Sequence, residues 1–329
     1  MRDVAAQAGV SPTAVSRYLN GAIKLPLKTE QRIDAAIEAL RYRPNPHARS
    51  LSRGRSDTIG LVVPDIGNTF FAHLAAAVEE AAEARGFGVM LCVTANRIER
   101  ELHYLERLSR NHVDALLFVT NHVDDGRLAA AIGKSKAVVL LDEDVTGAKA
   151  DKIFADNEGG GALAAQHLLE AGHRRLAYVG GPKDLMSARE RREGFRSLIV
   201  RSGRSVRFTE LFGDYSMDHG RLATAVLFDG DDAPTAIFSG SDAITLGALA
   251  ELRARGLVVG ADVSLITFDD VSPLEFFDPP LTAVRQSVAQ MGRRGVELLV
   301  EERSNPARMI VDRLPVELIR RASVAPPRR

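Results

Sequence analysis

Short apolar runs alternate with segments of helical periodicity from Thr58 onward, and this alternation limits the folds open to the chain. TIGLVV and GVMLCV each precede a helical segment, and DALLFV and AVVLLD follow. The pattern recurs after Asp156 with RLAYVGG, ELFGD, TAIFSG and VSLITFDD. Such alternation is typical of parallel sheets joined by crossover helices. We therefore predict two Rossmann-like α/β lobes, each with a sheet of four or five strands.

The first 56 residues differ from the rest of the chain in charge. They hold ten Lys and Arg against four Asp and Glu, a net charge of +6, whereas the remainder carries −6. A compact basic module joined to an acidic body suggests that the module binds a polyanion. A solvated basic face without a partner would give the same charge pattern.

This basic module has the pattern of three short helices around one small core. A helix over 2–8 ends at Gly9, and a second begins at Pro12 with Ser11 as its N-cap. A third is expected from about Leu27 to Leu40, which completes a helix-turn-helix unit. The residues predicted to face inward are Val4, Ala5, Ala8, Val15, Leu19, Ile33, Ile37 and Leu40.

The second helix of such a unit enters the major groove of DNA with its N-terminal side chains near the base edges. Here it exposes Thr13, Ser16, Arg17 and Asn20. Arginine can pair with guanine, and short polar side chains can hold phosphates. The residue types suit DNA, although a protein-interaction module can have the same shape.

The stretch RYRPNPHARSLSRGRS reads as a basic linker, because it combines two prolines with repeated arginines. One interpretation is a flexible tether. The other is that ARSL forms a helical turn on DNA and exposes Leu51, which would wedge into a base step from the minor groove.

Polar and aromatic residues gather where the predicted strands end, which is where ligands bind open α/β sheets. Acids, amides and aromatic faces together suit a small polyhydroxylated ligand. The first lobe offers Asp65 to Asn68, Phe70, Phe71, Thr94, Asn121 and Asp142, and the second offers Gly180-Gly181, Asp214-Tyr215, Ser241-Asp242 and Asp269-Asp270.

Motifs of catalysis are missing from the sequence. It contains no GxSxG, HExxH or GxxxxGK[ST] pattern, and its eight histidines are scattered singly. The run 159–161 of three glycines has neither the GxGxxG spacing nor a following lysine, so we interpret DNEGGG as a turn and a helix start. The single cysteine, Cys92, is expected in the core. We predict no enzyme activity, no cofactor and no metal site.

Six motifs, in order, resemble those of the LacI/GalR family of transcriptional regulators. They are GVSPTAVSRYLNG, RYRPNPHARSL, TIGLVVPDIGNTFF, DNEGGG with HLLEAGHRRLAYVGG, SARERREGF, and TFDDVSPLEFFDPPLTAVRQ. Together they cover essentially the whole chain. The resemblance implies an α/β fold class with a small all-α helix-turn-helix headpiece and two Rossmann-like lobes of periplasmic-binding-protein type.

The resemblance also implies a homodimer on a near-palindromic double-stranded operator. Thr13 and Arg17 would read bases, Leu51 would enter the minor groove, and Pro12 departs from the residues common at its position. Only Met1 and Arg2 precede Asp3 where the family has a capping threonine, so either the first helix is shortened or the true start lies upstream. The positions expected at DNA are Ser11, Pro12, Thr13, Ser16, Arg17, Asn20, Lys24, Asn45, Arg49 and Leu51.

Between the lobes the family places a small-molecule effector, expected here to be a carbohydrate. Arg191 and Asp269 match frequent family contacts, and Ser241 stands where asparagine is usual. Both induction and corepression occur in the family, so the sign of control is open. The expected effector residues are Asp65, Asn68, Phe70, Phe71, Asp142, Arg191, Tyr215, Ser241 and Asp269.

The expected domain limits follow from the same reading. Residues 1–42 form the DNA-binding domain and 43–56 the hinge. The N-terminal lobe takes 57–156 and 286–315, and the C-terminal lobe takes 157–285 and 316–329. We expect a repressor that works in the cytoplasm, away from membranes, as a dimer without a C-terminal coiled coil. The competing interpretations are a transporter's sugar receptor, which the basic module disfavours, and a nucleotide-dependent enzyme, which lacks its phosphate loop.

Overall fold

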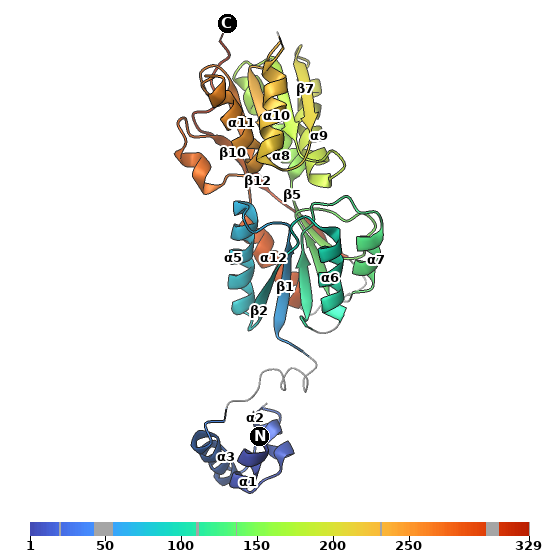
Figure 1. Ribbon diagram of the computed structural model, residues 1–329, viewed down its shortest axis with the longest axis vertical. Helices are drawn as coiled ribbons and strands as arrows, with labels where there is room; N and C mark the ends of the chain where they lie inside the picture. The colour runs from blue at the N-terminus through green and yellow to red at the C-terminus, as the bar shows by residue number, and fades with distance from the viewer. Residues whose placement is uncertain are drawn as a thin grey trace. The chain divides into compact units, whose positions relative to one another are not determined.

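The computed structural model describes residues 1–19, 21–42, 55–109, 112–135, 137–230, 232–300 and 309–328. The chain divides into two compact units, Met1–Ser56 and Asp57–Arg329 (Figure 1). Each unit has its own hydrophobic core, so each is described by itself.

The first unit consists of α1 (Arg2–Ala8), α2 (Pro12–Leu19) and α3 (Leu27–Ala39). Gly9 ends α1 with a φ of 64°, a left-handed conformation that glycine adopts without strain. The Oγ of Ser11 accepts a 3.1 Å hydrogen bond from the backbone N–H of Ala14, which confirms the predicted cap of α2. The buried core comprises Val4, Ala5, Ala8, Val15, Ile33 and Ala36.

One prediction about α3 was wrong. Leu40 is 43% exposed, because the helix ends at Ala39 and Leu40 lies beyond it. Ala36, one turn from Ile33, is buried, and Ile37 is partly buried and packs against the core as predicted. Leu19 of α2 is likewise only partly buried.

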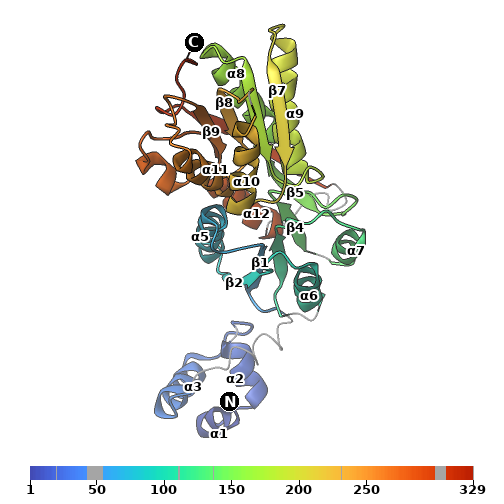
Figure 2. The same cartoon turned by 45° about the horizontal axis from the view of Figure 1, so that its top comes forward.

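The second unit contains two six-stranded sheets (Figures 1 and 2). The first has the order β11-β5-β4-β3-β1-β2, and all its pairings are parallel. Its strands are β1 (Thr58–Val63), β2 (Gly88–Val93), β3 (Ala115–Phe118), β4 (Val138–Leu141), β5 (Asp151–Ala155) and β11 (Val311–Leu314).

The second sheet has the order β12-β10-β9-β8-β6-β7 and is parallel except where β12 pairs with β10. Its strands are β6 (Arg175–Gly180), β7 (Arg207–Phe212), β8 (Ala236–Ser239), β9 (Ser264–Phe268), β10 (Thr282–Gln286) and β12 (Val316–Ile319).

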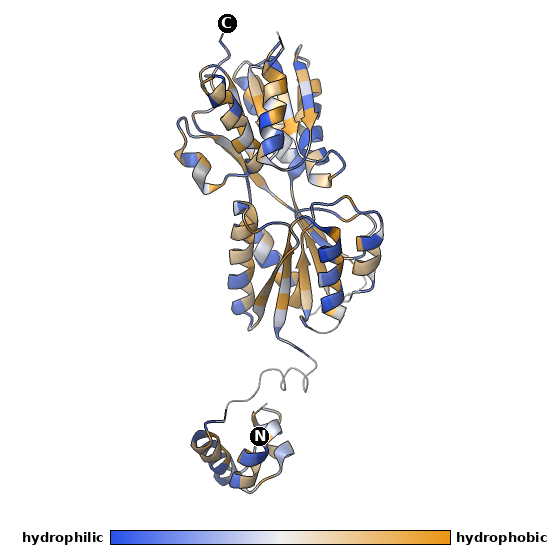
Figure 3. Ribbon diagram, in the orientation of Figure 1, coloured by the Kyte–Doolittle hydropathy of each residue, from blue (hydrophilic) through white to orange (hydrophobic). Residues whose placement is uncertain are grey.

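Helices cover both faces of each sheet, and apolar strand residues supply the core between them (Figure 3). On the first sheet, α5 (Thr69–Glu83) and α12 (Val288–Val300) cover one face, and α6 (Ile98–Ser109) and α7 (Arg127–Gly133) the other. On the second, α8 (Asn157–Glu170) and α9 (Met186–Arg201) pack opposite α10 (Met217–Phe228) and α11 (Asp242–Ala254). Cys92 is buried in the first of these lobes, as expected.

The prediction of four or five strands per sheet was too low. The sequence reading omitted β5, β10, β11 and β12, the strands through which the chain passes between the lobes. It leaves the first sheet after β5, leaves the second after β10, and passes directly from β11 to β12. A short 3-10 helix, η1 (Ser272–Phe276), precedes β10.

Three glycines bring α8 close to its neighbours. A Cβ on Gly161 would lie 2.1 Å from the carbonyl oxygen of Arg191 in α9, and one on Gly194 would lie 1.9 Å from that of Glu158. A Cβ on Gly160 would lie 2.6 Å from the ring of Phe268. DNEGGG therefore serves helix packing, and Asp156 accepts a 2.9 Å hydrogen bond from the N–H of Gly159 as the cap of α8.

Candidate functional site

One cleft gathers residues from the carboxyl ends of strands in both lobes of the second unit. All nine residues predicted to bind an effector line it, which brings together segments far apart in the sequence. The lining consists of Asp65, Asn68, Phe70, Phe71, Asn96, Asn121, Asp142, Ser187, Arg191, Tyr215, Ser241, Asp242, Asp269 and Gln286.

Asp142 and Asp269 occupy equivalent places in the two lobes. Each directly follows a strand, has a left-handed backbone with φ of 65° and 76°, and donates its N–H to the adjacent strand, to Ile153 and Val284 respectively. Burial raises the pKa of Asp142 to about 7 and that of Asp269 to about 6, with Arg191 opposing both shifts. The cleft thus holds two carboxyl groups that titrate near neutral pH.

Arg191 projects from α9 and is only 4% exposed. Its Nε donates to the Oδ1 of Asn157 over 2.8 Å, and its Nη1 donates to the carbonyl oxygen of Gly240 over 2.7 Å. The guanidinium also lies 3.7 Å from the centroid of the Phe268 ring, within reach of a cation–π interaction. These contacts fix its position at the cleft.

Several lining residues also cap helices. The Oδ1 of Asn68 accepts a 2.8 Å hydrogen bond from the N–H of Phe70, and its Nδ2 donates to Asp242 across the lobes over 3.3 Å. The Oγ of Ser241 accepts a 3.3 Å hydrogen bond from Ile244 at the start of α11. Asn68 and Ser241 therefore stabilise the starts of α5 and α11 as well as lining the cleft.

Glu143 links the two lobes by hydrogen bonds, and the sequence analysis did not predict this role. Its carboxylate accepts hydrogen bonds from the N–H of Met186 at 2.7 Å and from the N–H and Oγ of Ser187 at 3.2 and 2.6 Å. The hydroxyls of Ser187 and Tyr215 lie 2.9 Å apart. Burial raises the pKa of Glu143, while its hydrogen bonds oppose the rise. A carboxylate of the first lobe therefore caps the N-terminal end of α9 in the second lobe.

Three lining residues were not predicted: Asn96, Ser187 and Gln286. Gln286 ends β10, a strand that the sequence reading missed, and Ser187 lies within α9 and follows no strand. Several strand-end candidates do not line the cleft, among them Thr94, Gly180, Gly181, Asp214 and Asp270. Thr94 is fully buried, and Asp270 forms ion pairs with Arg285 and Arg321.

Phe70 and Phe71 contribute less aromatic surface to the cleft than expected. Their rings meet edge to face with centroids 5.2 Å apart, and the residues are 6% and 7% exposed. Both belong to the hydrophobic core of the first lobe. Their main contribution is to anchor the first turn of α5 in the core next to the cleft.

In the first unit, α2 presents its N-terminal residues to solvent. Ser11, Pro12, Thr13 and Arg17 are exposed, and Ser16 is half-buried. The hydroxyl of Tyr18 donates to the carboxylate of Asp34, which ties α2 to α3. Lys24 is also exposed. Asn20, Asn45, Arg49 and Leu51 lie outside the described residues.

A helix-turn-helix unit followed by a two-lobed α/β body with a polar cleft defines the class of ligand-responsive DNA-binding regulators. Residues 1–45 match the model of bacterial regulatory proteins, lacI family, and residues 165–324 match the periplasmic binding protein-like domain. In the part of the chain that the structure describes, no helix is long and apolar enough to cross a membrane.

Characterised proteins agree with these matches. The HTH-type transcriptional repressor PurR of Aliivibrio salmonicida is 32% identical, covering 92% of this chain and 91% of that protein. The HTH-type transcriptional regulator CelR of Thermobifida fusca is 34% identical over 94% of both. The lac repressor dimer bound to operator and the anti-inducer ONPF superposes with a TM-score of 0.86, at 28% identity over 98% of both chains. The chain belongs to the lacI family of bacterial regulatory proteins.

Proposed function

We propose that this protein is a sequence-specific transcriptional repressor whose operator binding is controlled by a small molecule held between its two lobes. The observation that carries the proposal is the convergence of the nine predicted residues on one cleft of a body that follows a helix-turn-helix unit. Its relatives PurR and CelR are transcriptional regulators, and the lac repressor structure contains operator DNA. It acts as a regulator in the cytoplasm and not as an enzyme.

The proposed domain division assigns 1–42 to DNA binding and 43–56 to a hinge. Residues 57–156 and 286–315 form the N-terminal lobe, and 157–285 and 316–329 form the C-terminal lobe. The strand pairings support this division, except that β10, through Gln286, pairs in the second sheet. Thr13 and Arg17 would contact bases, and Ser11, Ser16 and Lys24 phosphates, since short polar and basic side chains fill these roles.

The proposed effector is a carbohydrate. Hydroxyl groups need fixed hydrogen-bonding partners, and the cleft provides carboxylates, amides and the guanidinium of Arg191. A CelR structure is a complex with cellobiose, at a TM-score of 0.73 and 32% identity. A LacI-family regulator from Enterococcus faecium carries bound ribose, at 29% identity.

The location of the cleft between the lobes explains how a bound ligand would control operator binding. A ligand that contacts both lobes favours one relative orientation of them, and this orientation sets the spacing of the hinges in a dimer. Reciprocity requires that operator binding change effector affinity by the same factor.

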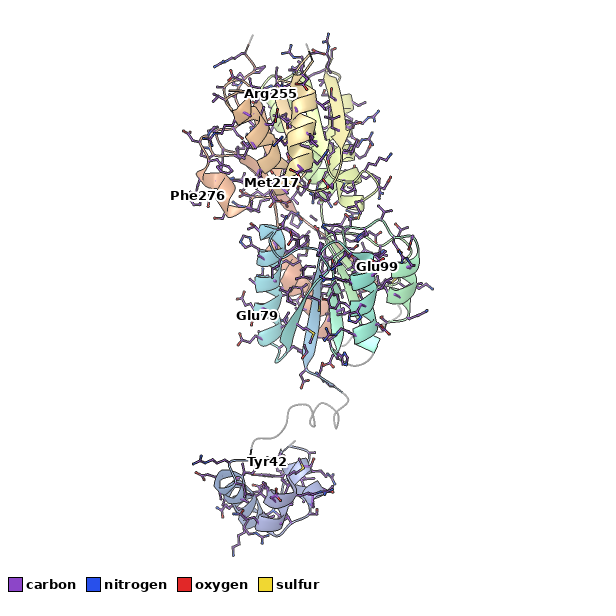
Figure 4. The ribbon with its side chains drawn as sticks, in the orientation of Figure 1. Tyr42, Glu79, Glu99, Met217, Arg255 and Phe276 are labelled. Carbon is purple, nitrogen blue, oxygen red and sulfur yellow. The ribbon has the colours of Figure 1, made fainter. Side chains whose placement is uncertain are left out.

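We propose that the dimer forms through an apolar face of the second lobe. Leu222 and Val226 lie one turn apart on α10 and are each 63% exposed. Met217 at the start of α10 and Phe276 of η1, both labelled in Figure 4, are 52% and 77% exposed. Exposed apolar side chains of this size mark interaction surfaces where they cluster. Leu222→Arg should give a monomer in sedimentation. Val200→Arg, at a 71% exposed position of α9 across the sheet, should leave the dimer intact.

The functional test is selection of bound sequences from randomised duplex DNA, repeated with a panel of sugars. A near-palindrome whose retention changes with one compound supports the proposal and gives the sign of control. If the full chain enriches no sequence, the proposed DNA binding is wrong.

A further inference from the structure

We infer that the effector carries no anionic group: the cleft selects an uncharged or cationic ligand rich in hydrogen-bond donors, and rejects phosphorylated and carboxylated sugars. This inference rests on the proposed function, because it concerns the ligand of the same cleft. It is carried by the charge of the lining and by two buried acceptor atoms.

The lining is strongly acidic. Asp65, Asp142, Asp242 and Asp269 face a single guanidinium, that of Arg191. Sites that bind phosphate or carboxylate groups place arginine forks, lysines or free helix N-termini against the anion. Among the lining residues that the structure describes, no second cation is present to do so.

Arg191 already uses two of its N–H groups in hydrogen bonds within the protein. Its Nε and Nη1 already donate to Asn157 and Gly240, so the fork geometry that binds an anion with two parallel hydrogen bonds is partly used. Two helix N-termini at the cleft already have acceptors from the protein. Glu143 closes α9, and Ser241 caps α11.

Gln286 has an unpaired acceptor, which favours a ligand with hydrogen-bond donors. Its Nε2 donates to the Oδ1 of Asp269 over 2.6 Å, and because a carboxylate oxygen accepts, this contact fixes the orientation of the amide. The opposite atom, Oε1, is therefore an acceptor. The residue is 7% exposed and lines the cleft, and its Oε1 has no hydrogen-bond partner.

Asp142 in the first lobe has an acceptor oxygen without a partner, as Gln286 does. Its Oδ1 is buried without a hydrogen-bond partner, and its residue lines the cleft opposite Asp269. Buried acceptors are costly unless a donor reaches them. Hydroxyl or ammonium groups of a ligand would satisfy both atoms, whereas a phosphate or carboxylate would add acceptors and repulsion.

The electrostatics agree with this assignment. Beyond burial, Asp269 raises the pKa of Asp142, and Asp242 raises the pKa of Asp269, so these carboxyl groups repel one another across the cleft. A further anion would meet the same repulsion, while an ammonium group would relieve it.

The test measures the affinity of the full chain for parent sugars and their charged derivatives, by calorimetry at constant salt and at about pH 8, above the pKa values of Asp142 and Asp269. The sets are glucose, glucosamine, glucuronate and glucose 6-phosphate; ribose and ribose 5-phosphate; and cellobiose with cellobionate. For each parent sugar that binds, we expect the anionic derivative to bind at least about tenfold more weakly. Glucosamine should bind at least as well as glucose.

Asp142→Asn provides the internal control. Above the raised pKa of Asp142 it removes one charge and retains an oxygen acceptor, so it should reduce the penalty against anionic derivatives several-fold relative to their parents. A role in packing alone would weaken every compound equally and leave that ratio unchanged, which would contradict the inference. An anionic derivative that binds as tightly as its parent would overturn it directly. If no compound of any charge binds, the proposed carbohydrate site fails, and the inference fails with it.

Discussion

The Oγ of Ser187 donates a 2.6 Å hydrogen bond to the carboxylate of Glu143, and this contact joins the two lobes. Glu143 follows β4 of the first sheet, whereas Ser187 lies in the first turn of α9 on the second. Glu143 is 2% exposed and also accepts from two backbone N–H groups of α9. The contact therefore ties the relative orientation of the lobes to the position of one buried carboxylate.

Glu143→Gln should weaken this connection. The amide keeps one acceptor but loses the charge that the N-terminal end of α9 favours, so the free energy of unfolding should fall by about 1–3 kcal/mol. Urea denaturation measures the loss. The matched control is Glu190→Gln, which breaks the cross-lobe ion pair with the more exposed Arg313 and should cost no more than about 1 kcal/mol. Equal losses in the two variants would contradict a special role for Glu143.

Gly161→Ala should separate α8 from α9. The added Cβ would meet the backbone of Arg191 at 2.1 Å, and backbone cannot swing aside as a flexible side chain can. We expect a destabilisation of about 1–3 kcal/mol together with weaker effector binding, because Arg191 shifts. The control is Gly133→Ala in α7, whose Cβ would meet nothing within 4 Å. Thermal unfolding that ranks the two variants equally would refute the packing argument.

Arg17→Ala should relax base preference at one position of each half-site. A bidentate contact to guanine is worth about 1–3 kcal/mol of discrimination. Lys28→Ala removes an equally exposed positive charge from α3 and should affect all sequences alike. Repeating the sequence selection with both variants measures this. A preference unchanged by Arg17→Ala would remove Arg17 from direct base reading.

His173 should make stability depend on pH on the acid side. It is 1% exposed, and its Nε2 lies 2.9 Å from the carbonyl oxygen of Ala325 in the C-terminal segment. Burial lowers the pKa of His173 to about 4, so the unfolded chain binds a proton more readily than the folded one below about pH 6.5. The contribution of His173 to stability is therefore complete above about pH 6.5, and about 3 kcal/mol of it is lost as pH decreases through 4.

His173→Asn removes this titrating group. The variant should be less stable at pH 7, and its free energy of unfolding should lack the part of the acid slope that His173 contributes. Asp142 and Asp269, whose raised pKa values act in the opposite direction, remain in both proteins, so the difference between the two curves isolates His173. Parallel curves between pH 4 and 7 would contradict the assignment.

The sequence predicted local features well where one residue type has one physical use. Ser11 before Pro12 indicated a cap and a first helical turn, and both are present. Apolar runs such as TIGLVV indicated strands buried on both faces. The strand ends Asp142 and Asp269 were found because ligands bind beyond the carboxyl ends of parallel strands.

Features that depend on distant pairing were not predictable in the same way. The strand β11 contains Asp312 and Arg313 and reads as polar, and only its pairing with β5, about 160 residues earlier, makes it a strand. Glu143 stands in a row of three acids, and nothing local distinguishes the one that reaches α9. Leu40 was assigned to the core by periodicity, but the helix ends one residue before it.

The most direct test of the account is operator affinity, measured by fluorescence anisotropy with and without the effector, for the native chain and Asp269→Asn. The variant replaces a cleft carboxylate that lies more than 200 residues after the DNA-reading helix in the sequence. The asparagine keeps an oxygen that can accept the hydrogen bond from Gln286. We predict unchanged operator affinity without effector and loss of the response to it. A variant that still responds like the native protein would show that this cleft does not control DNA binding.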